Sequence, residues 1–205
     1  MFNARKLNNK LHELHDVLVT ESLDMLCITE TWLKPSTPDS LLINGMSSYS
    51  VFRKDGADSQ GEGVCLITNC DTVQAIRVEI DVKYMDLDLL CIDILNTCLR
   101  VRVIVGYRPP SSETASDVIQ STNHFIECLR SLCNVDASIV LVGDFNFPNI
   151  DWSNLQFSVD NDRCSTFSLC LLNSIALTSL YLSRLDSNLV EMIHYLIWSC
   201  VTILL

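Results

Sequence analysis

Residues 137–142 (ASIVLV) form an uninterrupted apolar run that leads directly into Gly143, Asp144, Phe145 and Asn146. A short apolar run of this kind, bounded by turn residues, predicts a strand that is buried on both faces. Such a strand needs covering layers on either side of its sheet, which indicates an α/β protein. The run also places a carboxylate and an amide, two residues apart, at the exit of a buried strand, where α/β proteins assemble their sites.

Two periodicities divide the rest of the chain into helices and strands. Leu7, Leu11, Leu14 and Leu18 recur every three or four residues and predict an amphipathic helix, and residues 112–132 suit a second helix at the surface. Strands are predicted at residues 24–29, 61–68, 73–80, 87–95 and 99–107, with a loop from residue 32 to about residue 49. Because strands outnumber helices and do not alternate with them regularly, the pattern predicts one α/β sandwich domain over residues 1–205.

The charge of the chain limits the partners it can bind. Its 25 acidic residues outnumber its 14 basic residues, which gives a formal net charge of -11. A protein that binds nucleic acid on its own usually carries a basic face. The composition therefore argues against tight, autonomous binding to DNA, although a site that collects divalent cations does need carboxylates.

Cysteine usage and the two ends of the chain indicate an intracellular protein, nuclear or cytoplasmic, with no membrane segment. The ten cysteines show no zinc-binding spacing, and most stand in apolar runs, so they are interpreted as reduced thiols packed as small hydrophobic residues. Residues 1–14 lack the apolar core of a secretory signal. Residues 192–205 are almost wholly apolar, but these 14 positions fall short of the roughly 20 that a membrane-spanning helix requires, and we predict a buried strand there.

Asp144 and Asn146 are the first candidates for chemistry. If the chain stays extended after Gly143, both side chains project into one site. There Asp144 could activate a water molecule, and Asn146 could orient that water or a phosphate oxygen. Glycine, aspartate and asparagine are also ordinary turn residues, so a plain turn is the alternative.

Other candidates stand where further strands end. Glu30, in ITETW, could bind a hard cation such as Mg²⁺, and a solvated glutamate is the alternative. Tyr107, in VGYRPP, could donate to a phosphate oxygen with Arg108 as a cationic partner, or it could simply close the edge of the core before a proline turn. Asn3 could hydrogen-bond to metal-bound water or to phosphate.

The order of the motifs NARKLNNK, ITETWL, GEGV, GYRPP and GDFN, followed by DW, resembles the endonuclease domain that precedes the reverse transcriptase in non-LTR retrotransposons. The resemblance covers residues 3–152. It implies the four-layered α/β sandwich of the endonuclease/exonuclease/phosphatase superfamily, cleavage of DNA phosphodiesters that depends on Mg²⁺ (or Mn²⁺), and a reverse transcriptase domain in the parent element. It also implies that Asn3 and Glu30 serve the metal, that Tyr107 contacts the scissile phosphate, and that Asp144 with Asn146 activates and orients the attacking water.

The chain departs from that family pattern at both ends. Met1 stands two residues before Asn3, where the family has a strand, and the closing Ser-Asp-His motif does not occur. Residues 160–205 diverge, and the best local match places His194 where the family has an aspartate, a doubtful replacement. We therefore expect a fold that is incomplete at both ends, an exposed apolar sheet edge, and little or no activity. A non-catalytic relic or interaction module, or a small-molecule phosphodiesterase or phosphatase, are the alternatives on the same fold.

Overall fold

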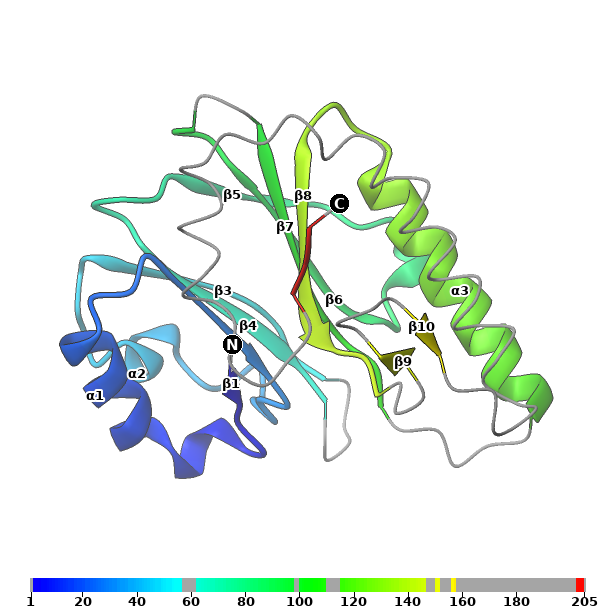
Figure 1. Ribbon diagram of the computed structural model, residues 1–205. Coiled ribbons are helices and arrows are strands. Elements are labelled where there is room, and N and C mark those ends of the chain that lie inside the picture. Colours follow the sequence, from blue (N-terminus) through cyan, green and yellow to red (C-terminus); the bar gives the residue numbers. More distant parts are fainter. Residues whose placement is uncertain are drawn as a thin grey trace.

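The computed structural model describes residues 2–56, 62–97, 100–109, 115–146, 150–151, 156–157 and 202–204. Two mixed sheets pack face to face, and helices cover the outer face of each (Figure 1). The order of layers is helices, sheet, sheet, helix. This arrangement confirms the predicted four-layered α/β sandwich of the endonuclease/exonuclease/phosphatase type.

The first sheet has the strand order β1-β2-β4-β3. Its strands are β1 (Phe2–Asn3), β2 (Met25–Thr29), β3 (Tyr49–Lys54) and β4 (Val64–Asn69). Strand β1 runs parallel to β2, whereas β4 is antiparallel to both β2 and β3. The helices η1 (Leu7–Asn9), α1 (Leu11–Thr20) and α2 (Asp39–Leu42) belong to the layer outside this sheet.

The second sheet has the strand order β11-β8-β7-β6-β5. Its strands are β5 (Ala75–Val78), β6 (Asp88–Ile94), β7 (Val101–Tyr107), β8 (Ser138–Asp144) and β11 (Thr202–Leu204). Only β7 and β8 are parallel among the paired strands of this sheet that the structure describes. Helix α3 (Ala115–Cys133) covers its outer face, and η2 (Val82–Tyr84), β9 (Ile150–Asp151) and β10 (Gln156–Phe157) complete the described elements.

Apolar residues fill each of the three interfaces between layers. Between the sheets, alternate residues of β7 such as Val101, Val103 and Val105 pack against residues of β2 and β4. The leucine stripe of α1 behaves as its spacing predicts, because Leu14 and Leu18 are buried against the first sheet. The outer face of the second sheet packs against α3.

The structure differs from the sequence prediction in two places. Strand β3 and the short helix α2 lie in or beside the segment predicted as a loop, because β3 (YSVFRK) is an edge strand with a mixed sequence and mostly half-buried side chains. Strand β11 pairs with β8, so the apolar edge that was expected to be exposed is covered at Thr202–Leu204.

The described cysteines fit the interpretation as free thiols. Six of them lie in the described ranges, none of these is in a disulfide, and Cys27, Cys65, Cys91 and Cys128 are buried. Over the same ranges, no helix has both the length and the apolar character that would let it cross a membrane.

Candidate active site

One amide connects the two sheets at the candidate site. The side-chain nitrogen Nδ2 of Asn3, at the end of β1, donates to Glu30 Oε1 at 2.7 Å and to Asp144 Oδ2 at 3.1 Å. Glu30 follows β2 in the first sheet, and Asp144 ends β8 in the second. All three side chains are half-buried. The structure thus brings together three of the residues that the sequence singled out.

Tyr107 lies directly beside this group. It pairs in register with Asp144 on β8 and with Asp88 on β6, so the three residues form a row across the second sheet. Tyr107 packs among the residues between the sheets, and burial, followed by the charges of Glu30 and Asp144, raises the pKa of its phenol to about 12. The hydroxyl therefore stays protonated at neutral pH and is available as a hydrogen-bond donor.

The GDFN motif divides into residues that shape the chain and residues that face the site. Gly143 pairs with Gly106 on β7, and a Cβ atom added to Gly143 would lie 2.0 Å from the carbonyl oxygen of Gly106 and 2.7 Å from the Phe145 ring. Phe145 is 4% exposed and meets Phe125 of α3 edge-on. The glycine pair thus admits the Phe145 ring, which anchors the turn that presents Asp144.

Arg108 and Asn146 brace the same turn through the backbone. The amide of Arg108 donates to the Asp144 carbonyl oxygen at 2.9 Å, and Asn146 Nδ2 donates to the Arg108 carbonyl oxygen at 2.7 Å. Asn146 has φ 49°, and its own amide reaches Asp144 Oδ1 at 3.3 Å. The guanidinium of Arg108 donates to Thr122 Oγ1 on α3 at 3.2 Å. The chain is therefore not extended at Asn146, and the site roles of Asn146 and Arg108 stay predictions.

Glu30 is held in a backbone conformation that residues with a side chain rarely adopt. Its φ is 52°, and that of Trp32 is 51°. The amide of Thr31 donates to the Gly63 carbonyl oxygen and the amide of Trp32 to that of Glu62. Gly63 has φ 95°, and a Cβ atom there would lie 2.5 Å from Thr31 Oγ1, so the close approach of these two loops requires glycine. Strain of this kind is typical of functional sites.

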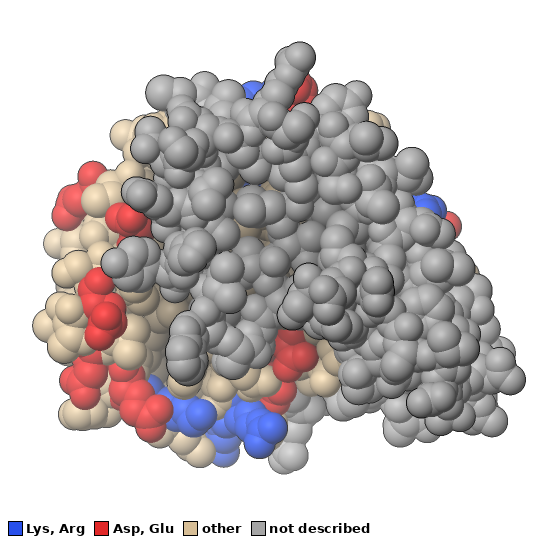
Figure 2. All heavy atoms as spheres, in the orientation of Figure 1, with Lys and Arg blue, Asp and Glu red and all other residues tan. Residues whose placement is uncertain are grey.

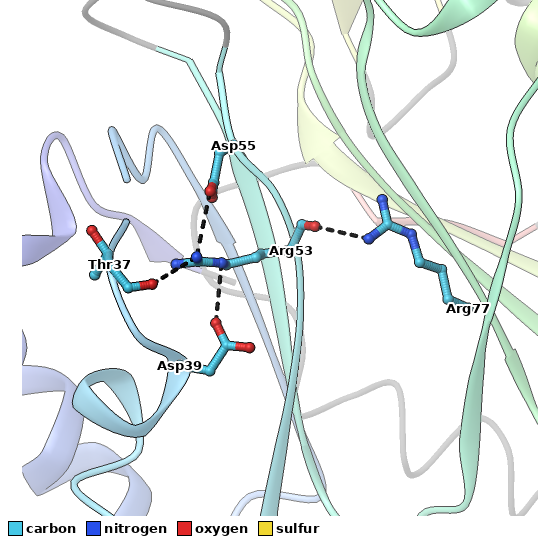
Figure 3. Close-up of polar contacts among 5 residues, drawn as sticks. All are labelled: Thr37, Asp39, Arg53, Asp55 and Arg77. Carbon is cyan, nitrogen blue, oxygen red and sulfur yellow. Dashed lines mark hydrogen bonds and ion pairs between the residues drawn. The ribbon is translucent and has the colours of Figure 1, made fainter. Parts of the chain in front are cut away.

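Arg53 of β3 clamps the loop that follows Glu30 (Figure 3). Its guanidinium donates to the Thr37 carbonyl oxygen at 2.7 Å and pairs with Asp39 at 3.1 Å and with Asp55 at 3.5 Å. Arg77 in turn donates to the Arg53 carbonyl oxygen at 3.2 Å. No local sequence pattern marks this clamp, because it joins residues 37–39 and Arg77 of β5 to the end of β3.

Asp88 is a further acidic residue at the site, and it was not predicted from the sequence. Burial is the main cause that raises its pKa to about 6, and the charge of Glu62 adds to the rise, whereas a backbone hydrogen bond from Gly63 and the charge of Lys54 oppose it. Its only signal in the sequence is its position, because it opens β6 on the face that Leu90 and Ile92 turn toward the other sheet. This alternation places Asp88 beside Tyr107, at the opening between the sheets that we call the site mouth.

The donor set fits a hard divalent cation. Two carboxylates, Glu30 and Asp144, share one amide, and Mg²⁺ typically takes one or two carboxylates and completes its shell with water and phosphate. The oxygen Oδ1 of Asn3 is buried and has no hydrogen-bond partner in the described part of the chain.

No group of three or more His, Cys, Asp or Glu residues forms a metal cluster within the described ranges. His194 lies outside the described residues.

The model of the endonuclease/exonuclease/phosphatase family matches residues 2–187. The chain belongs to this family. Members of the family are metal-dependent phosphodiesterases and nucleases, which is the class of chemistry that the two bridged carboxylates suit. No curated protein matches the chain.

Solved structures of nucleases share the fold. An AP endonuclease from Archaeoglobus fulgidus is 19% identical with a TM-score of 0.57, over 83% of this chain and 68% of that one. A 3'-5' exonuclease from Neisseria meningitidis is 20% identical with a TM-score of 0.55, over 74% and 58%. The endonuclease domain of TRAS1, a telomere-specific non-LTR retrotransposon, is 14% identical with a TM-score of 0.54, over 84% and 70%. This chain therefore spans 58% to 70% of the length of these three proteins.

Proposed function

We propose that this chain is a phosphodiesterase that depends on a divalent metal and cleaves DNA, as the endonuclease domain of a non-LTR retrotransposon does when it nicks its target. One observation carries the proposal: the amide of Asn3 joins the carboxylates of Glu30 and Asp144, from two different sheets, beside the protonated phenol of Tyr107. The order of the sequence motifs supports the retrotransposon origin. Two proteins of similar fold, the Neisseria enzyme and D. rerio TDP2, have been solved with product DNA, which supports DNA as the substrate.

Each residue has a role that follows from its surroundings. Asp144 is fixed by bonds from the Asn3 side chain and the Asn146 amide, so its carboxylate can take a proton from water at a defined position. Tyr107 donates to a phosphate oxygen. Glu30 and Asn3 would hold Mg²⁺ or Mn²⁺, which when bound supplies Lewis-acid neutralisation of phosphate charge.

We also propose that these 205 residues alone nick DNA poorly. No Ser-Asp-His string occurs in the sequence, and in the domains that the chain resembles this motif supplies the histidine that binds phosphate at the transition state. The loss of such a group costs several orders of magnitude in rate. A non-catalytic interaction module is therefore the second candidate, which the missing motif and the net charge of -11 favour. A reverse transcriptase domain of the parent element would be the natural partner in either case.

The test is nicking of supercoiled plasmid in Mg²⁺ or Mn²⁺. The chain as it stands is expected to remain at background, and the chain extended by a family-type segment with Ser-Asp-His is expected to nick. In the extended chain, Asp144→Asn and Glu30→Gln should each lower the rate at least about 100-fold. Asp136→Asn is the matched control, because Asp136 is exposed and precedes β8, at the opposite end from Asp144. Nicking that survives both site variants, or that needs no metal, would exclude the proposed site.

A further inference from the structure

Two residues between β1 and η1 have a strained backbone. Arg5 has φ 43° and Lys6 has φ 81°, both in the left-handed region. Such conformations are unfavourable for residues with a side chain, which keep them only where the surroundings fix them. Strain in two successive residues, separated from Asn3 by Ala4 alone, is typical of a functional segment.

Backbone hydrogen bonds fix the segment against the end of β2. The amides of Ala4, Lys6 and Leu7 donate in turn to the carbonyl oxygens of residues 29, 30 and 31, at 2.9, 3.0 and 2.9 Å. The side chains of Ala4 and Leu7 are fully buried. The segment is therefore anchored on both sides of Arg5 and Lys6, and it is tied to the same residues that carry Glu30.

The two basic side chains between these anchors are exposed. Neither Arg5 nor Lys6 takes part in any ion pair within the ranges that the structure describes. Figure 2 shows Lys and Arg side chains gathered along the lower edge of this face, where Figure 1 places the segment between β1 and η1, with acidic side chains beside them. The site mouth itself is acidic, because four carboxylates act on Tyr107.

The other basic side chains near the mouth have partners within the protein. Lys54 Nζ donates to the Met85 carbonyl oxygen, Arg108 donates to Thr122, and Arg53 is held in its clamp. A single phosphodiester at the metal site needs no cation outside that site. A polynucleotide brings further phosphates, and an acidic mouth repels them unless basic side chains at its rim contact them.

We propose that Arg5 and Lys6 bind the phosphates that flank the reacting one, so that the substrate is a polynucleotide strand rather than a compound with one phosphate. The proposal rests on the proposed function, since it assigns the neighbouring carboxylates to the reaction. The strained backbone turns two successive side chains outward beside Asn3, whereas an extended strand would turn them to opposite faces.

The test is DNA binding by the full chain, measured by fluorescence anisotropy of a labelled duplex in EDTA over a range of salt concentrations. Each lost phosphate contact lowers the slope of log K against log salt by about 0.9. Arg5→Ala with Lys6→Ala is therefore expected to lower the slope by about 1 to 2 and to weaken binding about 5- to 30-fold at low salt. Arg100→Ala is the matched control, because Arg100 is exposed at the opposite end of β7.

A second variant separates charge from backbone strain. Arg5→Asn with Lys6→Asn keeps side chains that tolerate the left-handed region, and it should reproduce the loss of slope with an unchanged midpoint of urea unfolding. Calorimetry of Mn²⁺ binding tests the proposed function separately, because Glu30→Gln should abolish metal binding and keep the DNA slope. Two results would overturn the proposal. One is a slope of log K against log salt that is the same in the double variants, in Arg100→Ala and in the unaltered chain. The other is DNA binding that does not respond to salt.

Discussion

Strand β6 carries two carboxylates in opposite environments. Asp93 faces outward, where Arg102 of β7 donates to both of its oxygens, from Nε at 2.6 Å and from Nη2 at 2.9 Å, and these hydrogen bonds lower the pKa of Asp93. The same arginine donates to the Leu132 carbonyl oxygen near the end of α3. Asp88 faces inward at the site mouth, where burial raises its pKa to about 6.

The two aspartates differ in whether their charge has a partner of opposite sign. On the outer face the buried guanidinium of Arg102 donates to both oxygens of Asp93 and to the Leu132 carbonyl oxygen, so its charge is paired. At the mouth, several carboxylates converge on the Tyr107 phenol, and burial disfavours the charged form of Asp88. Groups whose ionisation is disfavoured in the folded protein lower its stability and are typical of functional sites.

The largest effect is expected on the outer face. Asp93→Ala leaves Arg102 buried with an unpaired charge, and we expect the free energy of unfolding to fall by about 3 to 5 kcal/mol. Urea unfolding with comparable m-values measures this change. Asp93→Leu combined with Arg102→Met removes both charges and should recover most of the loss. If the double variant is as unstable as the single one, the cost does not come from the unpaired charge.

The sequence predicted the elements that have strong apolar patterns. The runs that became β2, β4, β6, β7 and β8, and the stripe of α1, bury one whole face or both, so their periodicity determines their structure. Strand β3 has a weak pattern because it lies at a sheet edge and carries the charged Arg53, which pairs with Asp39 at the start of α2. Its pairing with β4 comes from tertiary contacts that no local window contains.

The sequence also located the candidate site residues but not their partners. Asn3, Glu30, Tyr107 and Asp144 stand at strand ends, and this position is visible locally. Asn3 and Asp144 are 141 residues apart, so their hydrogen bond depends on the packing of two sheets. Asp88 became visible only through its register with Tyr107, because a strand-opening aspartate has no distinctive local pattern.

The second largest effect is a change in how the free energy of unfolding depends on pH, and it is expected for variants of Asp88. Its folded pKa is raised from 3.8 to about 6, so its stabilising contribution is present below pH 3.8 and is lost as the pH rises through about 6. Asp88→Asn should therefore raise the free energy of unfolding in EDTA by about 1 to 2 kcal/mol at pH 8 and by little at pH 3.5. Asp93 has a lowered pKa, so Asp93→Asn should cost most at pH 8 and progressively less as the pH falls through the folded pKa. Parallel pH profiles for the two variants would contradict the comparison.

The smallest effect is the increase in melting temperature that a divalent cation causes by binding at the site mouth. A cation that binds only the folded state stabilises it by RT ln(1 + [L]/Kd), which is about 1.4 kcal/mol when its concentration is ten times Kd. Mg²⁺ or Mn²⁺ should therefore raise the melting temperature of the unaltered chain by a few degrees, since it relieves the repulsion between Glu30 and Asp144. Glu30→Gln should melt at the same temperature with and without the cation. Asp136→Asn, which removes one exposed carboxylate from the far end of β8, should keep the full increase. An equal increase in both variants would mean that the cation binds general surface charge, and the bridged carboxylates would then have no special affinity for it.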